Sequence, residues 1–260
     1  MPKWVCSDFT QHTRIDSKSF YKKLTSLALP IAIQSFISSS LNLVDSLMVG
    51  SLGETELAAV GIGLQPFFLF WMILFGFNGG CSTFTAQFWG VQNLENIRRV
   101  LGFAITICVS EGTVLFVFSW LYTREFVHLF TDDPAAVELA VDYIRIGSPV
   151  FFMMGISLPL QISLRATQQP RIPLAISMVA FSTNTFLNYV FIFGNFGAPA
   201  MGVQGAAMAT VISRFIELML VLWMVFGRKN IISGPMNQFF RWNKLLMGRL
   251  FRNSLPTTAN

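Results

Sequence analysis

Six long runs of apolar residues follow one another along the chain, separated by short polar segments. They cover about residues 24–47, 57–88, 100–121, 137–161, 172–194 and 203–226. Each run is long enough to cross about 30 Å of hydrocarbon as an α-helix, and none shows the period-two alternation of a β-barrel strand. The pattern predicts an all-α, polytopic membrane protein with a six-helix transmembrane lobe. Pro66 is a predicted kink in the second run.

A short repeat frames the six runs. Residues 23–30 read Lys-Leu, four residues, then Leu-Pro, and residues 249–256 read Arg-Leu, four residues, then Leu-Pro. Because an even number of crossings returns a chain to its starting side, the second copy is expected to begin where the first began. We therefore predict a cytoplasmic tail at 1–23, the lobe at 24–226, a cytoplasmic linker at 227–249 and the start of a truncated second lobe at 250–260. Duplicated helical bundles are typical of secondary transporters.

The composition supports a membrane protein. Hydrophobic residues make up 53% of the chain and charged residues only 12%, about half of the charged fraction that is usual in soluble domains. Residues 1–23 lack the apolar core of a cleavable signal, so the first run is predicted to act as an uncleaved anchor. The three cysteines, Cys6, Cys81 and Cys108, show neither a disulfide framework nor metal-ligand spacing.

The basic residues sort to one side of the predicted membrane. Fifteen of the 18 lysines and arginines lie on one side: in the N-terminal tail, in the loops that join run two to run three and run four to run five, and in the segment after the last run. The loops on the opposite side hold only Arg124. This asymmetry predicts that the N-terminus is cytoplasmic. The expected location is the inner (plasma) membrane of the cell. It also explains the net charge of +5 without a nucleic-acid partner.

Asp45 is an isolated ionisable residue within the first run, because none lies between Lys23 and Asp45. A charged group in hydrocarbon is costly and is therefore a candidate functional residue. Two interpretations stay open. The carboxylate either marks the interfacial end of the helix, or it faces a water-filled cavity and binds a proton or Na⁺.

Three uncharged polar residues are expected at the depth of Asp45. Asn184 and Asn188 are four residues apart in the fifth run and therefore share one helix face, and Thr210 lies in the outer third of the sixth run. Such a group either forms a polar nest whose amide oxygens help to bind H⁺ or Na⁺, or makes ordinary hydrogen bonds between helices.

We single out five other charged residues within the runs. Two pairs are three residues apart, Asp142 with Arg145 and Arg214 with Glu217, and Glu111 lies near the middle of the third run. Opposite charges at matched depth are expected to neutralise one another inside the bundle. A role in a proton relay or in substrate binding is the alternative.

Motifs for enzyme chemistry are missing from the sequence. It contains no phosphate-binding glycine loop with Lys-Ser/Thr, no His-Glu-x-x-His and no Gly-x-Ser-x-Gly. No predicted loop is long enough to hold a soluble catalytic domain. We predict that the chain is not an enzyme and needs no cofactor, only H⁺ or Na⁺ as a coupling ion.

An ordered set of short motifs resembles the multidrug and toxic compound extrusion (MATE) family, in particular its bacterial NorM-like branch. The motifs are LALP at 27–30, VDSLMVG at 44–50, LAAVG at 57–61, GVQN at 90–93, NTFLNY at 184–189 and GVQGAAMAT at 202–210. Together they cover about residues 24–230 in the order expected of the family's N-terminal half.

The resemblance implies one half of a twelve-helix, two-lobe transporter that exports amphipathic cationic compounds by alternating access, in exchange for H⁺ or Na⁺. Asp45, Asn184 and Asn188 match the family's polar cluster in the N-terminal lobe, and Thr210 is a weaker match. Drugs, the coupling cation and membrane lipid are the expected partners. Asp45 is the residue expected to bind Na⁺ or H⁺. The second lobe of the family is absent from the sequence. One alternative is therefore a truncated membrane fragment without transport of its own. Another is a protein similar to a lipid-linked sugar flippase, because related families share the broad architecture.

Overall fold

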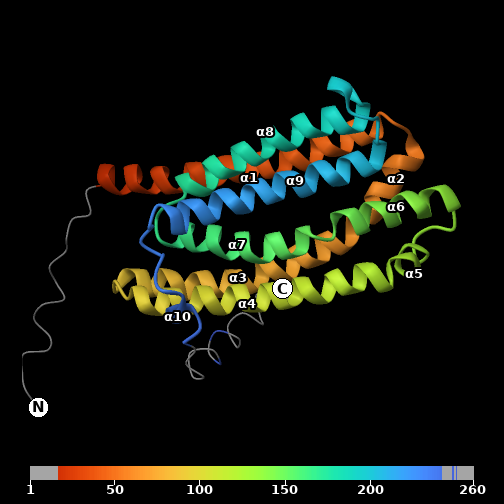
Figure 1. Ribbon diagram of the computed structural model, residues 1–260. Coiled ribbons are helices and arrows are strands. Elements are labelled where there is room, and N and C mark those ends of the chain that lie inside the picture. The colour runs from red at the N-terminus through yellow and green to blue at the C-terminus, as the bar shows by residue number, and fades with distance from the viewer. Residues whose placement is uncertain (1–16, 242–247, 249, 251–260) are drawn as a thin grey trace, which may run out of the picture.

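The computed structural model describes residues 17–241, 248 and 250, and the regular elements of these residues are all helices. The longer helices lie alongside one another in one bundle (Figure 1). They are α1 (Ser17–Gly50), α2 (Glu54–Gly63), α3 (Gln65–Gly90), α4 (Leu94–Leu121), α6 (Pro134–Gly147), α7 (Val150–Ala166), α8 (Arg171–Phe193) and α9 (Gly202–Leu222). The shorter ones are α5 (Thr123–Val127), the 3₁₀-helix η1 (Asn195–Gly197), the π-helix η2 (Trp223–Gly227) and α10 (Met236–Phe239).

Five segments of the described chain are long and apolar enough to cross a membrane, and a bent pair of helices makes a sixth. This confirms the predicted all-α class and its six runs. The second run is divided where Pro66 predicted a kink, because α2 ends at Gly63 and α3 begins at Gln65. The fourth run is not the single helix that we predicted over 137–161. It consists of α6 and α7, which meet at 49° next to Pro149, a residue that has no backbone N–H to continue the ladder.

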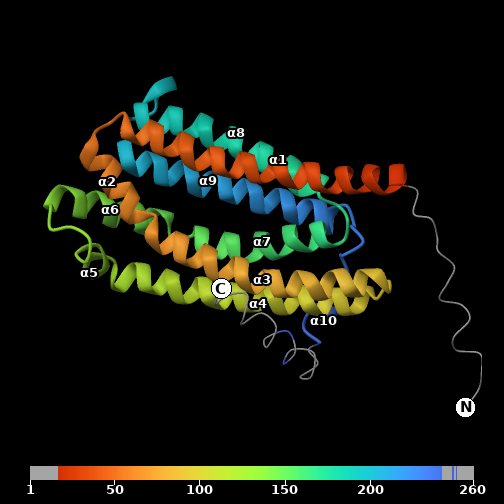
Figure 2. The ribbon, with the colours of Figure 1, turned by 180° about the vertical axis from the view of Figure 1, so that it is seen from behind.

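The bundle has two sides, which are clear from both directions (Figures 1 and 2). On one side, α8 packs against α1 and α9. On the other side, α4 packs against α3 and α7. Contacts of α7 and α6 with α9 join the two sides. Helix α9 is therefore in contact with α1, α6, α7 and α8, and its polar side chains can meet those of several other helices.

Local sequence signals set several helix ends. The Asn93 side chain accepts from the Asn96 backbone N–H at 3.1 Å and caps α4. Asp133 does the same for α6 through the N–H of Ala135 at 3.2 Å. Gly194 ends α8 with a φ of 72°, a left-handed conformation that glycine adopts without strain.

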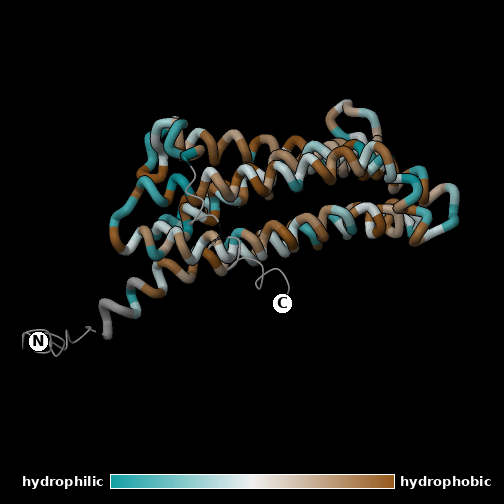
Figure 3. The backbone as a smooth tube through the Cα atoms, turned by 90° about the horizontal axis from the view of Figure 1, so that it is seen from below, coloured by the Kyte–Doolittle hydropathy of each residue, from teal (hydrophilic) through white to brown (hydrophobic). Residues whose placement is uncertain are grey.

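The outside of the bundle is apolar along most of its length. Phe36, Phe68 and Val114 are 73%, 61% and 68% exposed, which suits lipid and not water. Hydrophilic residues gather toward the two ends of the helices (Figure 3). The chain is a multi-pass membrane protein.

The predicted linker at 227–249 is not wholly separate from the bundle in its described part. Ile232 and Phe239 are buried in one apolar cluster with residues of α4, α7 and α9. Gly102 of α4 lies against the backbone carbonyl of Phe239, where a side chain would not fit. Most of the predicted tail (1–16) and all but Leu250 of the predicted second-lobe start lie outside the described residues.

Candidate functional site

Asp45 is hydrogen bonded to Asn188. The Nδ2 atom of Asn188, on α8, donates to Oδ1 of Asp45, on α1, over 2.5 Å. Asp45 is half-buried and Asn188 is fully buried. Because the two residues are on neighbouring helices and the amide faces inward, Asp45 lies inside the lobe and not against lipid.

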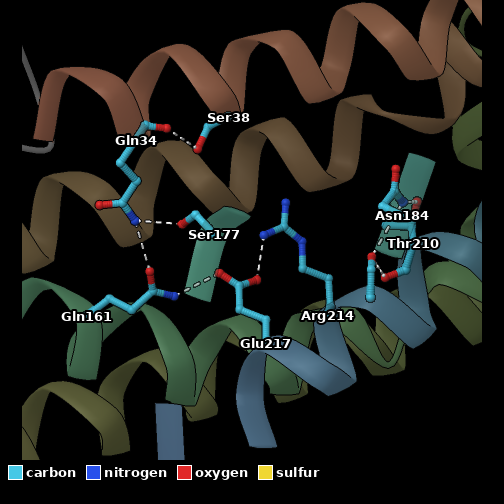
Figure 4. A network of polar contacts seen from close by, with 9 residues as sticks. Gln34, Ser38, Gln161, Ser177, Asn184, Thr210, Arg214 and Glu217 are labelled. Atoms are coloured by element: carbon cyan, nitrogen blue, oxygen red, sulfur yellow. Dashed lines mark hydrogen bonds and ion pairs between the residues drawn. The ribbon is translucent and has the colours of Figure 1, made fainter. Parts of the chain in front are cut away.

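The contact continues along α8 and onto α9. Asn188 also donates to Oδ1 of Asn184 at 3.2 Å. The Nδ2 atom of Asn184 lies 3.4 Å from the hydroxyl oxygens of both Thr210 and Ser213. Figure 4 shows Asn184 and Thr210. The structure therefore brings the four predicted residues, Asp45, Asn184, Asn188 and Thr210, into one hydrogen-bonded chain. Their role in binding an ion stays a prediction.

One buried oxygen atom in this row of hydrogen-bonded side chains, Oδ1 of Asn188, lacks a hydrogen-bond partner among the described residues. Both N–H groups of the Asn188 amide point to acceptors, on Asp45 and Asn184, so the orientation of the amide is fixed by its neighbours. Its Oδ1 atom has no hydrogen-bond partner in the described part of the protein, and a buried acceptor without a partner is costly. A proton on Asp45, or a small cation beside it, is the kind of ligand that such an oxygen would stabilise.

A second polar network lies beneath α1 (Figure 4). Gln161 of α7 donates to Oε1 of Glu217 at 2.8 Å, and its own Oε1 accepts from Gln34 of α1 at 3.2 Å. The Gln34 Nε2 atom is also 2.8 Å from the Ser177 hydroxyl of α8. The buried carboxylate of Glu217 therefore orients two amides in series and joins α1, α7, α8 and α9.

Arg214 stands between the two networks on α9. Its Nη1 atom is 2.7 Å from Oε2 of Glu217, which confirms the predicted neutralisation of this pair. The preceding residue, Ser213, contacts Asn184. Helix α9 therefore contributes to both networks, through Thr210 and Ser213 in the first and Glu217 in the second.

The other predicted pairing is wrong. Asp142 and Arg145 form no ion pair in the described chain. Asp142 accepts from Nε2 of Gln204, on α9, at 2.8 Å, and Nε of Arg145 is buried without a partner. A spacing of three residues allows Asp142 and Arg145 to come into contact on one helix. In the structure, the Asp142 carboxylate is instead hydrogen bonded to Gln204 of α9. Glu111 likewise has no ion pair among the described residues, and its buried Oε1 has no hydrogen-bond partner.

Sequence reasoning missed Gln34, Gln161, Ser177 and Ser213, because uncharged polar residues are common in membrane helices. For Gln34 a signal exists. It precedes Asp45 by eleven residues, close to three helical turns, so both residues lie on one face of α1. The sequence offers no comparable signal for Gln161 or Ser177.

A family model described as MatE matches residues 30–190. The chain is 26% identical to the probable multidrug resistance protein YoeA of Bacillus subtilis, over 93% of the chain and 53% of that protein. It is also 26% identical to the probable multidrug resistance protein NorM of Thermotoga maritima, over 80% of the chain and 45% of that protein. The chain therefore spans about half the length of the relatives it matches.

Solved structures share the fold. A multidrug resistance MATE family transporter in an outward-facing conformation superimposes with a TM-score of 0.77 at 23% identity, over 92% of this chain and 52% of the other. A crystal structure of MATE in the bent conformation gives a TM-score of 0.82 at 21% identity, over the same shares. The bundle thus corresponds in shape to one half of such a transporter.

Proposed function

The chain belongs to the MatE family of membrane transporters, and on this basis we propose that it is the N-terminal lobe of a cation-coupled multidrug efflux antiporter. The lobe would act in the export of amphipathic, cationic compounds in exchange for H⁺ or Na⁺. Membership of a transporter family confirms the prediction that the protein is not an enzyme.

The hydrogen-bonded chain from Asp45 to Thr210 is the observation that supports coupling. It combines a half-buried carboxylate with a buried amide oxygen that lacks a partner. H⁺ or Na⁺ binding at Asp45 would change the pattern of hydrogen bonds that ties α1 to α8. We propose that this change shifts the lobe between inward- and outward-open states and weakens the binding of the drug, so that the drug leaves outward.

A second lobe is part of the proposal, because the substrate site of a duplicated transporter lies between its halves. We propose an inner-membrane location with the N-terminus in the cytoplasm, based on the distribution of lysines and arginines.

Ethidium, an amphipathic fluorescent cation, offers a direct test. The chain is expressed in bacteria that lack their own multidrug pumps, both alone and joined to the second half of the Bacillus subtilis relative. We expect the active form to lower ethidium accumulation, and an ionophore that collapses the ion gradients to abolish this effect. Asp45→Asn should behave like the empty vector, whereas Asp142→Asn, at another half-buried carboxylate, should export normally.

The outcomes separate the alternatives. If the joined form lowers ethidium accumulation and the chain expressed alone does not, the chain needs a second lobe and is inactive by itself. Accumulation equal to the empty vector in both forms, with the protein present in the membrane, would contradict the proposed efflux. Unchanged coupled efflux by Asp45→Asn would remove Asp45 from the mechanism.

A further inference from the structure

A groove runs along the outside of the bundle between the first parts of α1 and α8. These helices pack against each other, and both begin toward the same end of the bundle (Figures 1 and 2). The α1 wall is a single stripe from Lys22 through Thr25 and Leu29 to Ile33, and the α8 wall is formed by Arg171 and Leu174. At 1.5 Å per residue the stripe is about 16 Å long, comparable to much of an extended acyl chain.

The groove changes from cationic to apolar along this length. Lys22 and Arg171 are exposed at its mouth. One to three turns deeper, its walls are Leu29 and Ile33, which are 54% and 40% exposed, together with Leu174. Lys22 lies two residues before the apolar segment Leu24–Gly50, and Arg171 is the first residue of the segment Arg171–Phe193. The charged end is therefore at the membrane boundary and the apolar part lies within the hydrocarbon layer.

The two positive charges are available for an external anion. In the described residues, neither Lys22 nor Arg171 forms an ion pair with a carboxylate. Thr25 already donates its hydroxyl hydrogen to the Tyr21 carbonyl at 2.8 Å, so Lys22 and Arg171 are the charged donors that the mouth offers. Helix α8 also begins here without a side-chain cap, and its dipole adds to the positive potential.

We propose that this groove binds an anionic phospholipid, with the phosphate between Lys22 and Arg171 and one acyl chain along Leu29, Ile33 and Leu174. The charge of the mouth suits a phosphate, and the exposed apolar walls suit a hydrocarbon chain at the same depth. The groove lies at the end of the bundle that holds most of the basic residues, which is the side where anionic lipids attract membrane proteins.

Native mass spectrometry of the purified 260-residue chain tests the proposal with phosphatidylglycerol and phosphatidylcholine of identical acyl chains. We expect phosphatidylglycerol to bind more tightly. Near a membrane surface each cation contributes about fivefold to the binding of anionic lipid, so Lys22→Gln with Arg171→Gln should weaken phosphatidylglycerol binding by roughly thirtyfold. The charge-retaining pair Lys22→Arg with Arg171→Lys should keep most of the preference.

A matched control removes two exposed cations elsewhere on the same side, by Lys229→Gln with Arg241→Gln. The control has the same net charge as the test variant and should bind phosphatidylglycerol like the parent. Equal loss in both pairs would overturn the proposal, because it would indicate general charge attraction. Equal binding of the two lipids by the parent would also overturn it. So would displacement of phosphatidylglycerol by an equal concentration of glycerol phosphate, because that result would indicate a site for a free phosphate.

Discussion

Asn188 donates its amide hydrogen to the carboxylate of Asp45 across 143 positions of sequence, with 2.5 Å between the two heavy atoms. This contact ties α1, whose side chains are largely exposed, to the well-packed α8. A change in the charge of Asp45 changes the strength of this bond, because hydrogen bonds to a charged group are stronger than those to a neutral one. The carboxylate can therefore influence how firmly α1 is held.

Asp45→Asn is expected to remove the response of the protein to its coupling cation. A ligand that binds only the folded state at 100 times its dissociation constant stabilises it by about 2.7 kcal/mol. The melting temperature of the parent in detergent should therefore rise with either Na⁺ or H⁺ concentration, and that of Asp45→Asn should not. KCl at equal ionic strength is the control for Na⁺. A variant with the full response of the parent would place the cation elsewhere.

Asn188→Ala should destabilise the lobe by about 1–3 kcal/mol, since it leaves the Asp45 carboxylate and the Asn184 carbonyl without their buried donor. The free energy of unfolding, measured by denaturation with sodium dodecyl sulfate in mixed micelles, provides the test. Asn195→Ala is the control, because this amide lies in η1, after the end of α8, and donates to the backbone carbonyl of Tyr189 near the end of that helix. Its effect should stay within about 0.5 kcal/mol, as for most changes outside a core. Equal effects of the two substitutions would show that the Asn188 contacts add little.

Arg214 and Glu217 are expected to be energetically coupled. The Glu217 side chain is buried, whereas that of Arg214 is 29% exposed, so loss of the arginine leaves a buried charge and should cost more than loss of the acid. The double variant Arg214→Gln with Glu217→Gln should lose about 1–3 kcal/mol less than the sum of the single variants. The same micellar unfolding measurement applies. Additive effects would mean that the two side chains act independently.

The depth of polar residues could be predicted from the sequence, but their partners across helices could not. Asn184 and Asn188 share a face because of their spacing, and their depth matched that of Asp45. The direction in which each helix turns its polar face depends on packing. Asp142 shows the limit, because its partner is Gln204 of another helix and not the arginine one turn away.

The bend in the fourth run has a similar explanation. A continuous apolar run predicts a straight helix, although Ser148 and Pro149 interrupt it. Proline is tolerated within membrane helices, as Pro30 is within α1, so the residue by itself does not decide between a helix and a break. The packing of α6 on α2 and of α7 on α4 favours two helices with different directions.

Cysteine labelling should place the two ends of the bundle on opposite sides of the membrane. In a Cys6→Ser background the remaining cysteines, Cys81 and Cys108, are buried. Asp132→Cys, in the exposed loop before α6, should react with a membrane-impermeant maleimide in intact spheroplasts, which expose the outer face of the inner membrane. Arg241→Cys should react only after permeabilisation. The reverse pattern would contradict the predicted cytoplasmic N-terminus.

Gly205 of α9 packs closely against the backbone of α8 near the C-terminal end of that helix. A β-carbon at this position would lie 2.6 Å from the backbone carbonyl oxygen of Phe191, and a backbone atom within a helix cannot move aside cheaply. Gly205→Ala should therefore separate the two helices that carry Asn188 and Thr210, and lower the free energy of unfolding by about 1–3 kcal/mol.

Gly79→Ala is the matched control, because a β-carbon there would meet nothing within 4 Å. With no clash, the higher helix propensity of alanine should make this variant more stable by about 0.5–1 kcal/mol. The two substitutions are chemically identical, so opposite signs in the same unfolding measurement would isolate the effect of helix packing. If Gly205→Ala proved as stable as Gly79→Ala, the close contact of α8 and α9 would not be needed to hold the polar chain together. The coupling proposed for Asp45 would then have to act without a rigid α8–α9 pair.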